Sequence, residues 1–224
     1  MFPLRDTQPN YTRPVVTIAL IAVNLVVFLF EFSLGPRALN ILIEYYGLVP
    51  DHFRLSSVFT SMFLHGGWMH VLGNMWFLWI FGDNVEDLLG HAKFLLFYLL
   101  CGMAAALSQV LINPYSTAPM VGASGAIAGI MGAYLIKFPR ARVLTLVFVF
   151  FFITTIEIPA PIMLAYWFVI QLFSGLGSIA RTHLSEGGGV AFFAHVGGFI
   201  TGMVLVKIMG TTERYNRRRD YYWQ

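Results

Sequence analysis

Charged side chains are scarce in this chain. Its 224 residues include 14 Lys or Arg and 11 Asp or Glu, so that 11% of the residues are charged and 58% are hydrophobic. Soluble domains contain about 25% charged and about 45–50% apolar residues. So few charges cannot cover the surface of a soluble domain of this length, which excludes an ordinary cytosolic enzyme. We therefore expect an integral membrane protein.

Cysteine is nearly absent, which excludes several kinds of site. The single Cys101 allows neither an intramolecular disulfide framework nor a multi-cysteine metal site. No HExxH or similar ligand spacing occurs, so we predict no metal and no cofactor. The net charge of +3 is explained by basic residues in cytoplasmic loops, and no basic patch with interleaved aromatic residues precedes the short C-terminal tail. We therefore predict no nucleic-acid partner.

Long apolar stretches dominate what is present. A spanning helix needs about 20 mainly apolar residues, and six stretches approach or reach that length: residues 14–32, 68–81, 94–112, 123–138, 159–176 and 190–206. We predict an all-α bundle of six transmembrane helices. Residues 33–64 mix Gly, Pro and charged residues and predict a long first loop at the membrane interface. The expected organisation is a cytoplasmic tail (1–13), a membrane domain (14–209) and a basic cytoplasmic tail (210–224).

One further apolar segment, residues 143–156, could be a seventh span. With six spans and both termini in the cytoplasm, 11 of the 14 basic residues lie on the cytoplasmic side, which leaves out Arg37, Arg54 and Arg181. A seventh span would move the basic C-terminal tail outside, against the positive-inside rule. We therefore expect residues 143–156 to be an interfacial or partly embedded cytoplasmic segment. The expected location is the cytoplasmic membrane of a prokaryote.

Four polar side chains lie inside these spans, where they are costly and therefore point to function. His70 and Asn74 are in the second span, Ser124 opens the fourth, and His195 is in the sixth. Even-numbered spans start at the outer face, so all four residues lie at a similar shallow depth. A secondary transporter would place such groups near mid-membrane and would show an internal repeat, which is not evident. The pattern favours one site beneath the outer surface.

Two of the four side chains lie on helix faces made of small residues. The fourth span presents Ser124, Gly125, Ala128, Gly129 and Gly132, and the sixth presents Ala191, His195, Gly198 and Gly202. Such faces let membrane helices approach closely, which would bring the His195 ring against the Ser124 hydroxyl. A histidine in hydrogen-bond reach can activate a serine as a nucleophile. The fourth span, about 20 Å long at helical rise, is shorter than the core of about 30 Å, which predicts a water-filled cavity above Ser124.

Each of these residues taken alone has a plainer explanation. A serine in a Gly-rich span and an asparagine in a membrane helix usually serve packing or interhelical hydrogen bonding. A zinc site could be assembled from His65, His70 and His195, but their spacing fits no metal motif. His65 lies in a loop, and spacing assigns it no chemistry. The joint pattern of four residues at one depth is what favours a nucleophilic site.

At these residues the sequence resembles the rhomboid family of intramembrane serine proteases, over residues 52–206. It contains His65-Gly-Gly-Trp-Met-His70-Val-Leu-Gly-Asn74, Gly122-Ala123-Ser124-Gly125 as the family GxSG, and Ala194-His195-Val-Gly-Gly198-Phe-Ile-Thr-Gly202 as the family AHxxGxxxG. The resemblance implies a six-helix core and a Ser–His dyad that cleaves transmembrane segments of other proteins. It implies Ser124 as the nucleophile and His195 as the general base. It also implies that Asn74 and His70, with backbone N–H groups at Ser124, form the oxyanion site.

The resemblance has two departures and leaves one alternative. Phe53-Arg54 stands where some members carry Trp-Arg, and Ala128 stands where some carry a tyrosine that stacks on the histidine. The expected partners are transmembrane protein substrates and the lipid bilayer; no oligomeric state is predicted. The alternative function is a non-catalytic rhomboid-like protein that binds or shuttles membrane-protein clients. Inactive relatives lose the Ser or the His, and this chain retains both.

Overall fold

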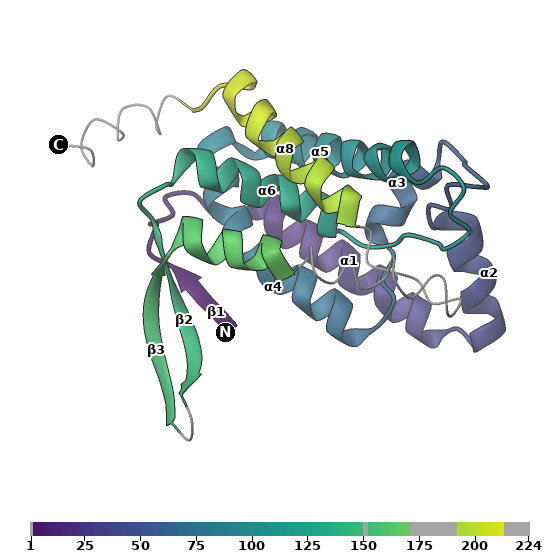
Figure 1. Ribbon diagram of the computed structural model, residues 1–224, viewed down its shortest axis with the longest axis horizontal. Coiled ribbons are helices and arrows are strands. Elements are labelled where there is room, and N and C mark those ends of the chain that lie inside the picture. Colours follow the sequence, from purple (N-terminus) through teal and green to yellow (C-terminus); the bar gives the residue numbers. More distant parts are fainter. Residues whose placement is uncertain (1, 150–151, 171–191, 213–224) are drawn as a thin grey trace.

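The computed structural model describes residues 2–149, 152–170 and 192–212 and is mostly helical (Figure 1). Five long helices form the body: α1 (Val15–Ser33), α4 (Trp68–Leu89), α5 (His91–Ile112), α6 (Ser124–Lys137) and α8 (Phe192–Ile208). A further helix, Ala160–Ile170, follows the strands. Within the described part of the chain, α1 and α5 are long and apolar enough to cross a membrane, and three helices are apolar but shorter. Six spans remain a prediction.

Helix α6 is the centre of the bundle. It contacts α4, α5 and α8 (Figure 1), and its residues from Gly125 to Tyr134 are buried without interruption. Its Gly and Ala residues let neighbouring backbones approach it closely. The site described below starts at the first residue of this helix.

The predicted contact between the small faces of the fourth and sixth spans is confirmed. A Cβ atom added to Gly198 would lie 2.1 Å from the Gly125 carbonyl oxygen, and one added to Gly202 would lie 1.9 Å from the Gly129 carbonyl oxygen. The backbones of α6 and α8 therefore approach so closely that only glycine fits at these two positions. Ala191 lies outside the described residues.

Helix α4 extends beyond the expected span of residues 68–81 and ends at Leu89. The acidic residues expected to follow the span lie on this helix and accept hydrogen bonds from the first turn of α1 and from the segment before it. The Glu86 carboxylate accepts from the backbone N–H groups of Val16 and Thr17 at 2.9 and 2.7 Å, and Asp87 accepts from the Thr12 hydroxyl at 2.6 Å. Because the Glu86 carboxylate satisfies free N–H groups at the start of α1, it stabilises that helix end and joins it to α4.

The all-α expectation is wrong at one end of the molecule. Strands β2 (Arg142–Val149) and β3 (Phe152–Pro159) form an antiparallel hairpin, and β1 (Phe2–Asp6) pairs with β2, giving a sheet in the order β1-β2-β3. The hairpin extends away from the helices (Figure 1). Residues 143–156 are rich in Val, Ile, Phe and Thr, which favour strands. Residues 2–6, expected to belong to a tail, supply the third strand.

The long first loop contains α2 (Pro36–Tyr46), α3 (Ser57–Thr60) and the short 3₁₀ helix η1 (Ser61–Phe63), at the end of the bundle away from the hairpin (Figure 1). Arg54 donates to the carbonyl oxygen of Glu44 at 3.1 Å, and its guanidinium lies 4.7 Å from the centre of the Tyr45 ring. This residue therefore holds the C-terminal end of α2. The interfacial position of the loop remains a prediction.

Candidate active site

Ser124 is the first residue of α6 and is positioned by the loop that precedes it. The Gly122 N–H donates to the Ser61 carbonyl at 2.9 Å, and Leu48 and Met120 exchange two backbone hydrogen bonds of 3.0 and 2.8 Å. The first loop thus anchors the chain that enters α6. The first N–H groups of the helix have no intrahelical partner, so Ser124 lies at a positively polarised helix end.

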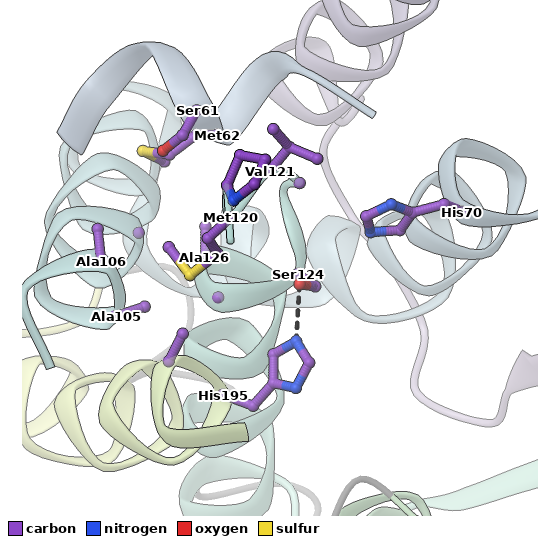
Figure 2. A pocket seen from close by; sticks show the side chains of 15 residues that line it. Ser61, Met62, His70, Ala105, Ala106, Met120, Val121, Ser124, Ala126 and His195 are labelled. Atoms are coloured by element: carbon purple, nitrogen blue, oxygen red, sulfur yellow. Dashed lines mark hydrogen bonds between the residues drawn. The ribbon is translucent and has the colours of Figure 1, made fainter. Parts of the chain in front are cut away.

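His195 lies on α8 opposite Ser124. Its Nε2 atom is 2.7 Å from the Ser124 Oγ atom, and the side chain is only 6% exposed. Figure 2 shows the two side chains pointing toward each other across the α6–α8 contact. The geometry permits the serine O–H to donate to Nε2, which is the arrangement in which an imidazole can withdraw the hydroxyl proton.

A cavity of about 260 Å³ opens at this pair. Figure 2 shows His70 on the opposite side of Ser124 from His195. The residues that line the cavity come from several elements, among them the first loop, α4, the loop before α6, α6 itself and α8. They include Ser61, Met62, His70, Met120, Ser124 and His195. The sequence predicted a cavity at this place.

His70 presents its Nε2 atom to the backbone just before Ser124. A Cβ atom added to Gly122 would lie 2.7 Å from His70 Nε2, and the φ angle of Gly122 is +126°, which only glycine adopts readily. The Gly66 N–H donates to His70 Nδ1 at 3.3 Å. Because Nδ1 accepts, the neutral ring carries its hydrogen on Nε2. His70 therefore offers an N–H donor to the cavity.

Asn74 lies one turn beyond His70 on α4, and His65 supports it. The Asn74 amide donates to His65 Nε2 at 3.1 Å, and His65 Nδ1 donates to the Phe63 carbonyl at 3.3 Å. These two bonds fix both the amide orientation and the tautomer of the His65 ring. One of the two Asn74 N–H groups is used in this contact, and the other remains available beside Gly122, where the amide nitrogen would lie 3.5 Å from an added Cβ atom.

His65 is itself held in a neutral state and in a fixed place. Burial, together with the smaller effect of the neighbouring His70, lowers the pKa of His65 to about 4. The ring is therefore uncharged at neutral pH and can accept from Asn74. The Glu31 carboxylate accepts from the His65 backbone N–H at 3.1 Å, which ties this loop to the end of α1.

The structure thus brings together all four residues that the sequence singled out. Ser124 and His195 are hydrogen-bonded, and His70 and Asn74 both border Gly122, two residues before Ser124. In the part of the chain that the structure describes, no group of three His, Cys, Asp or Glu side chains is arranged to hold a metal ion.

Comparison with known proteins identifies the family of this chain. A family model described as the Rhomboid domain matches residues 52–212. This chain belongs to the rhomboid family. The rhomboids are membrane proteins, and they include serine proteases that act on transmembrane proteins within the membrane.

Individual rhomboids match over part of their length. Rhomboid protein 1, mitochondrial, of Saccharomyces cerevisiae is 32% identical over 58% of this chain and 38% of that protein. RHOMBOID-like protein 6, mitochondrial, of Arabidopsis thaliana is 32% identical over 65% of this chain and 41% of that protein. Rhomboid protease GluP of Bacillus subtilis is 41% identical over 34% of this chain and 14% of that protein. The chain therefore spans about two fifths or less of these relatives.

These relatives bear on the expected location. They are named as mitochondrial or come from a bacterium, so membership of the rhomboid family establishes a membrane protein but does not support the narrower expectation of a prokaryotic cytoplasmic membrane.

One supporting residue of this rhomboid escaped the sequence reasoning. His65 lies in a loop, and its contact with Asn74 depends on how that loop folds back onto α4. The available signal was its place in the same short motif as His70 and Asn74. A histidine just before a span that carries an asparagine is a candidate hydrogen-bond partner for that asparagine, as His65 is for Asn74.

Proposed function

We propose that this rhomboid is a serine-type intramembrane endopeptidase that hydrolyses peptide bonds in or near transmembrane segments of other membrane proteins. The observation that carries the proposal is the 2.7 Å contact between Ser124 Oγ and His195 Nε2, made at a cavity that His70 also lines. Retention of both residues argues for the enzyme over a non-catalytic relative.

In the proposed first step, His195 Nε2 takes the Ser124 proton while Oγ attacks the carbonyl carbon of the scissile bond. A tetrahedral intermediate forms, its oxygen becomes negatively charged, and the His195 ring becomes an imidazolium. The close α6–α8 packing supports this step, because it holds the two side chains in reach before any substrate binds.

The developing oxyanion would be stabilised by N–H groups at the cavity and beside Gly122. His70 offers Nε2–H, Asn74 offers its second amide hydrogen, and the backbone N–H of Ser124 is free at the start of α6. Donors that are fixed in advance need no reorganisation when the charge appears. The Gly66, His65 and Gly122 contacts are what fix them.

Collapse of the intermediate would then break the C–N bond, and His195 would give its proton to the leaving amine. The resulting acyl-enzyme ester on Ser124 is hydrolysed by a water molecule, which His195 deprotonates in turn, and the serine is regenerated. No metal or cofactor takes part in this sequence.

The substrates of the proposed enzyme are transmembrane proteins, in keeping with the family. Ser124 and His195 lie at the ends of α6 and α8 that are away from the hairpin (Figure 1). We propose that both chain termini lie in the cytoplasm, which places the site near the outer surface. Cleavage would then occur near the outer end of a substrate segment.

A reconstituted assay tests this function. The protein is incorporated into liposomes with a single-span reporter, and cleavage is followed by gel and mass spectrometry. The unmodified protein is expected to cut within or beside the reporter span, and Ser124→Ala is expected not to. Ser108→Ala is the matched control, because that half-buried serine on α5 donates to its own helix at Ala104 and should leave cleavage unchanged.

The same assay separates the enzyme from the client-binding alternative. If the unmodified protein retained the reporter in co-purification without cutting it, and Ser124→Ala retained it equally well, the protease proposal would be wrong and the client-binding function would take its place.

A further inference from the structure

One ring nitrogen of His195, Nδ1, is buried without a hydrogen-bond partner among the described residues. With Nε2 accepting from Ser124, the neutral ring carries its hydrogen on Nδ1. In a catalytic triad a carboxylate at this nitrogen orients the ring and stabilises it when protonated. Among the described residues no carboxylate contacts this nitrogen, so a neighbouring group of another kind becomes the candidate for both effects.

An indole ring occupies the place beside His195. Trp167, on the helix Ala160–Ile170, has its ring centroid 5.6 Å from that of His195, with the two planes inclined at 56°. This separation is within the range of about 6 Å in which an aromatic ring attracts a cation, and tryptophan is the most effective aromatic residue in such contacts. The indole also limits the rotation of the smaller imidazole ring by bulk alone.

We propose that Trp167 is a positioning residue that holds the His195 ring against Ser124 and stabilises the imidazolium formed during catalysis. This inference rests on the proposed protease function. Trp167 is not among the residues that line the cavity at Ser124, and its effect reaches the reaction through His195.

A second contact of Trp167 fixes its own position. Its ring lies 6.3 Å from the ring of Phe77 on α4, at an interplanar angle of 44°. Phe77 follows Asn74 by three residues and so lies on the same side of the helix. Trp167 is therefore packed between the helix that carries the proposed oxyanion donor and the ring of the proposed base.

The neighbouring residue provides a matched control. Phe168 lies on the same helix and packs against α8 through Phe192 and Phe199, with ring centroids 5.9 and 5.6 Å apart. Replacing either Trp167 or Phe168 with alanine removes an aromatic contact with α8. Of these two residues, only Trp167 contacts His195. A comparison of the two variants therefore separates loss of packing against α8 from loss of support for the His195 ring.

The test measures the rate at which a fluorophosphonate labels Ser124, together with kcat and KM for the reporter. Trp167→Ala should lower the labelling rate and kcat by about 3- to 30-fold, the rate equivalent of one cation–π contact, with KM nearly unchanged. Trp167→Phe should recover part of the rate, and Trp167→Leu should not. Phe168→Ala should lower the melting temperature but label at the unmodified rate.

Other results would overturn the inference. Trp167 would be an ordinary packing residue if Trp167→Ala labelled as fast as Phe168→Ala, or if Trp167→Leu recovered the full rate. Failure of the unmodified protein to label or cleave would overturn the proposed function and this inference with it. Normal activity of the unmodified protein with an unaffected Trp167→Ala would overturn the inference alone.

Discussion

The direction of each hydrogen bond around Ser124 follows from the partners of neighbouring side chains. His70 accepts a backbone N–H at Nδ1, and Asn74 gives one of its two hydrogens to His65. Each therefore keeps one N–H group that these contacts do not use. The support comes from a loop that is tied to α1 through Glu31, so that residues of this loop fix the orientation of His70 and Asn74.

At this scale the first prediction concerns Asn74. Its amide would interact with charge that exists only in the transition state, so Asn74→Ala should lower kcat by about 10²–10³-fold and leave KM nearly unchanged. The measurement is steady-state cleavage of the single-span reporter in liposomes.

The matched control for Asn74 is Asn24→Ala. Asn24 is a buried amide on α1 that donates to the Leu20 carbonyl at 2.7 Å, and its loss should affect stability rather than kcat. A rise in KM with unchanged kcat in Asn74→Ala would show that Asn74 binds substrate and is not an oxyanion donor.

Sequence reasoning at the residue scale found the four side chains of the site because polar groups are conspicuous in apolar spans. It assigned no chemistry to His65, whose role depends on the path of a loop. It also gave no reason to connect Trp167 with His195, because a tryptophan in an apolar span has no distinguishing pattern and the contact depends on tertiary packing.

At the scale of elements, the contact between α6 and α8 positions the proposed dyad. Gly202→Ala would place a methyl group 1.9 Å from the Gly129 carbonyl oxygen. The helices would have to separate, with a loss of about 1–3 kcal/mol in the free energy of unfolding. We expect a lower melting temperature in detergent and slower labelling of Ser124.

Gly73→Ala is the control for this change. It lies on α4, and an added Cβ atom there would meet nothing within 4 Å. Its melting temperature should be unchanged or higher, because alanine favours a helix more than glycine does. Equal losses in the two variants would contradict the close α6–α8 approach.

The sheet is tied to the opposite end of α6 through Asp6. Its carboxylate accepts from the Asn84 amide at 2.8 Å and from the Tyr134 hydroxyl. Burial of this carboxyl is the main cause that raises its pKa from 3.8 to about 7. The native state therefore holds the proton more tightly than the unfolded chain, and stability falls as the pH rises from 3.8 to about 7.

This reasoning predicts the behaviour of Asp6→Asn. The variant keeps an oxygen acceptor but never ionises, so its advantage in melting temperature over the unmodified protein should grow from pH 3.8 to about 7 and then level off. Thermal unfolding in detergent across that range provides the check. A constant difference at every pH would mean that the Asp6 pKa is not raised in the folded protein.

Sequence reasoning at the scale of elements located the long helices because apolar length is a strong signal. It missed β1 because the pairing of β1 with β2 joins residues 2–6 to residues 143–146, and no local pattern predicts so distant a contact. The β2–β3 pairing is local, and its Val, Ile, Phe and Thr residues favour strands, but the apolar character of this segment was interpreted as contact with the membrane. It also placed the end of the second helix too early, since the acidic residues that looked like a helix boundary accept hydrogen bonds from the start of α1 and from the segment before it.

For the whole molecule, the site and the sheet lie at opposite ends of the helical body (Figure 1). The distribution of basic residues then predicts an orientation in the membrane. Reporters fused after Arg142 and after Arg219 should both read cytoplasmic, and one fused near Pro119 should read external. An external reading after Arg219 together with a cytoplasmic one after Arg142 would contradict the six-span topology.

The proposed dyad requires that His195 activates Ser124. The rate of covalent labelling by a fluorophosphonate measures this activation directly, with the modified residue located by mass spectrometry. We expect an adduct on Ser124 in the unmodified protein, none in Ser124→Ala and none in His195→Ala, while Ser108→Ala labels normally. If His195→Ala labelled as fast as the unmodified protein, the dyad would be wrong and His195 would be a packing residue between α6 and α8.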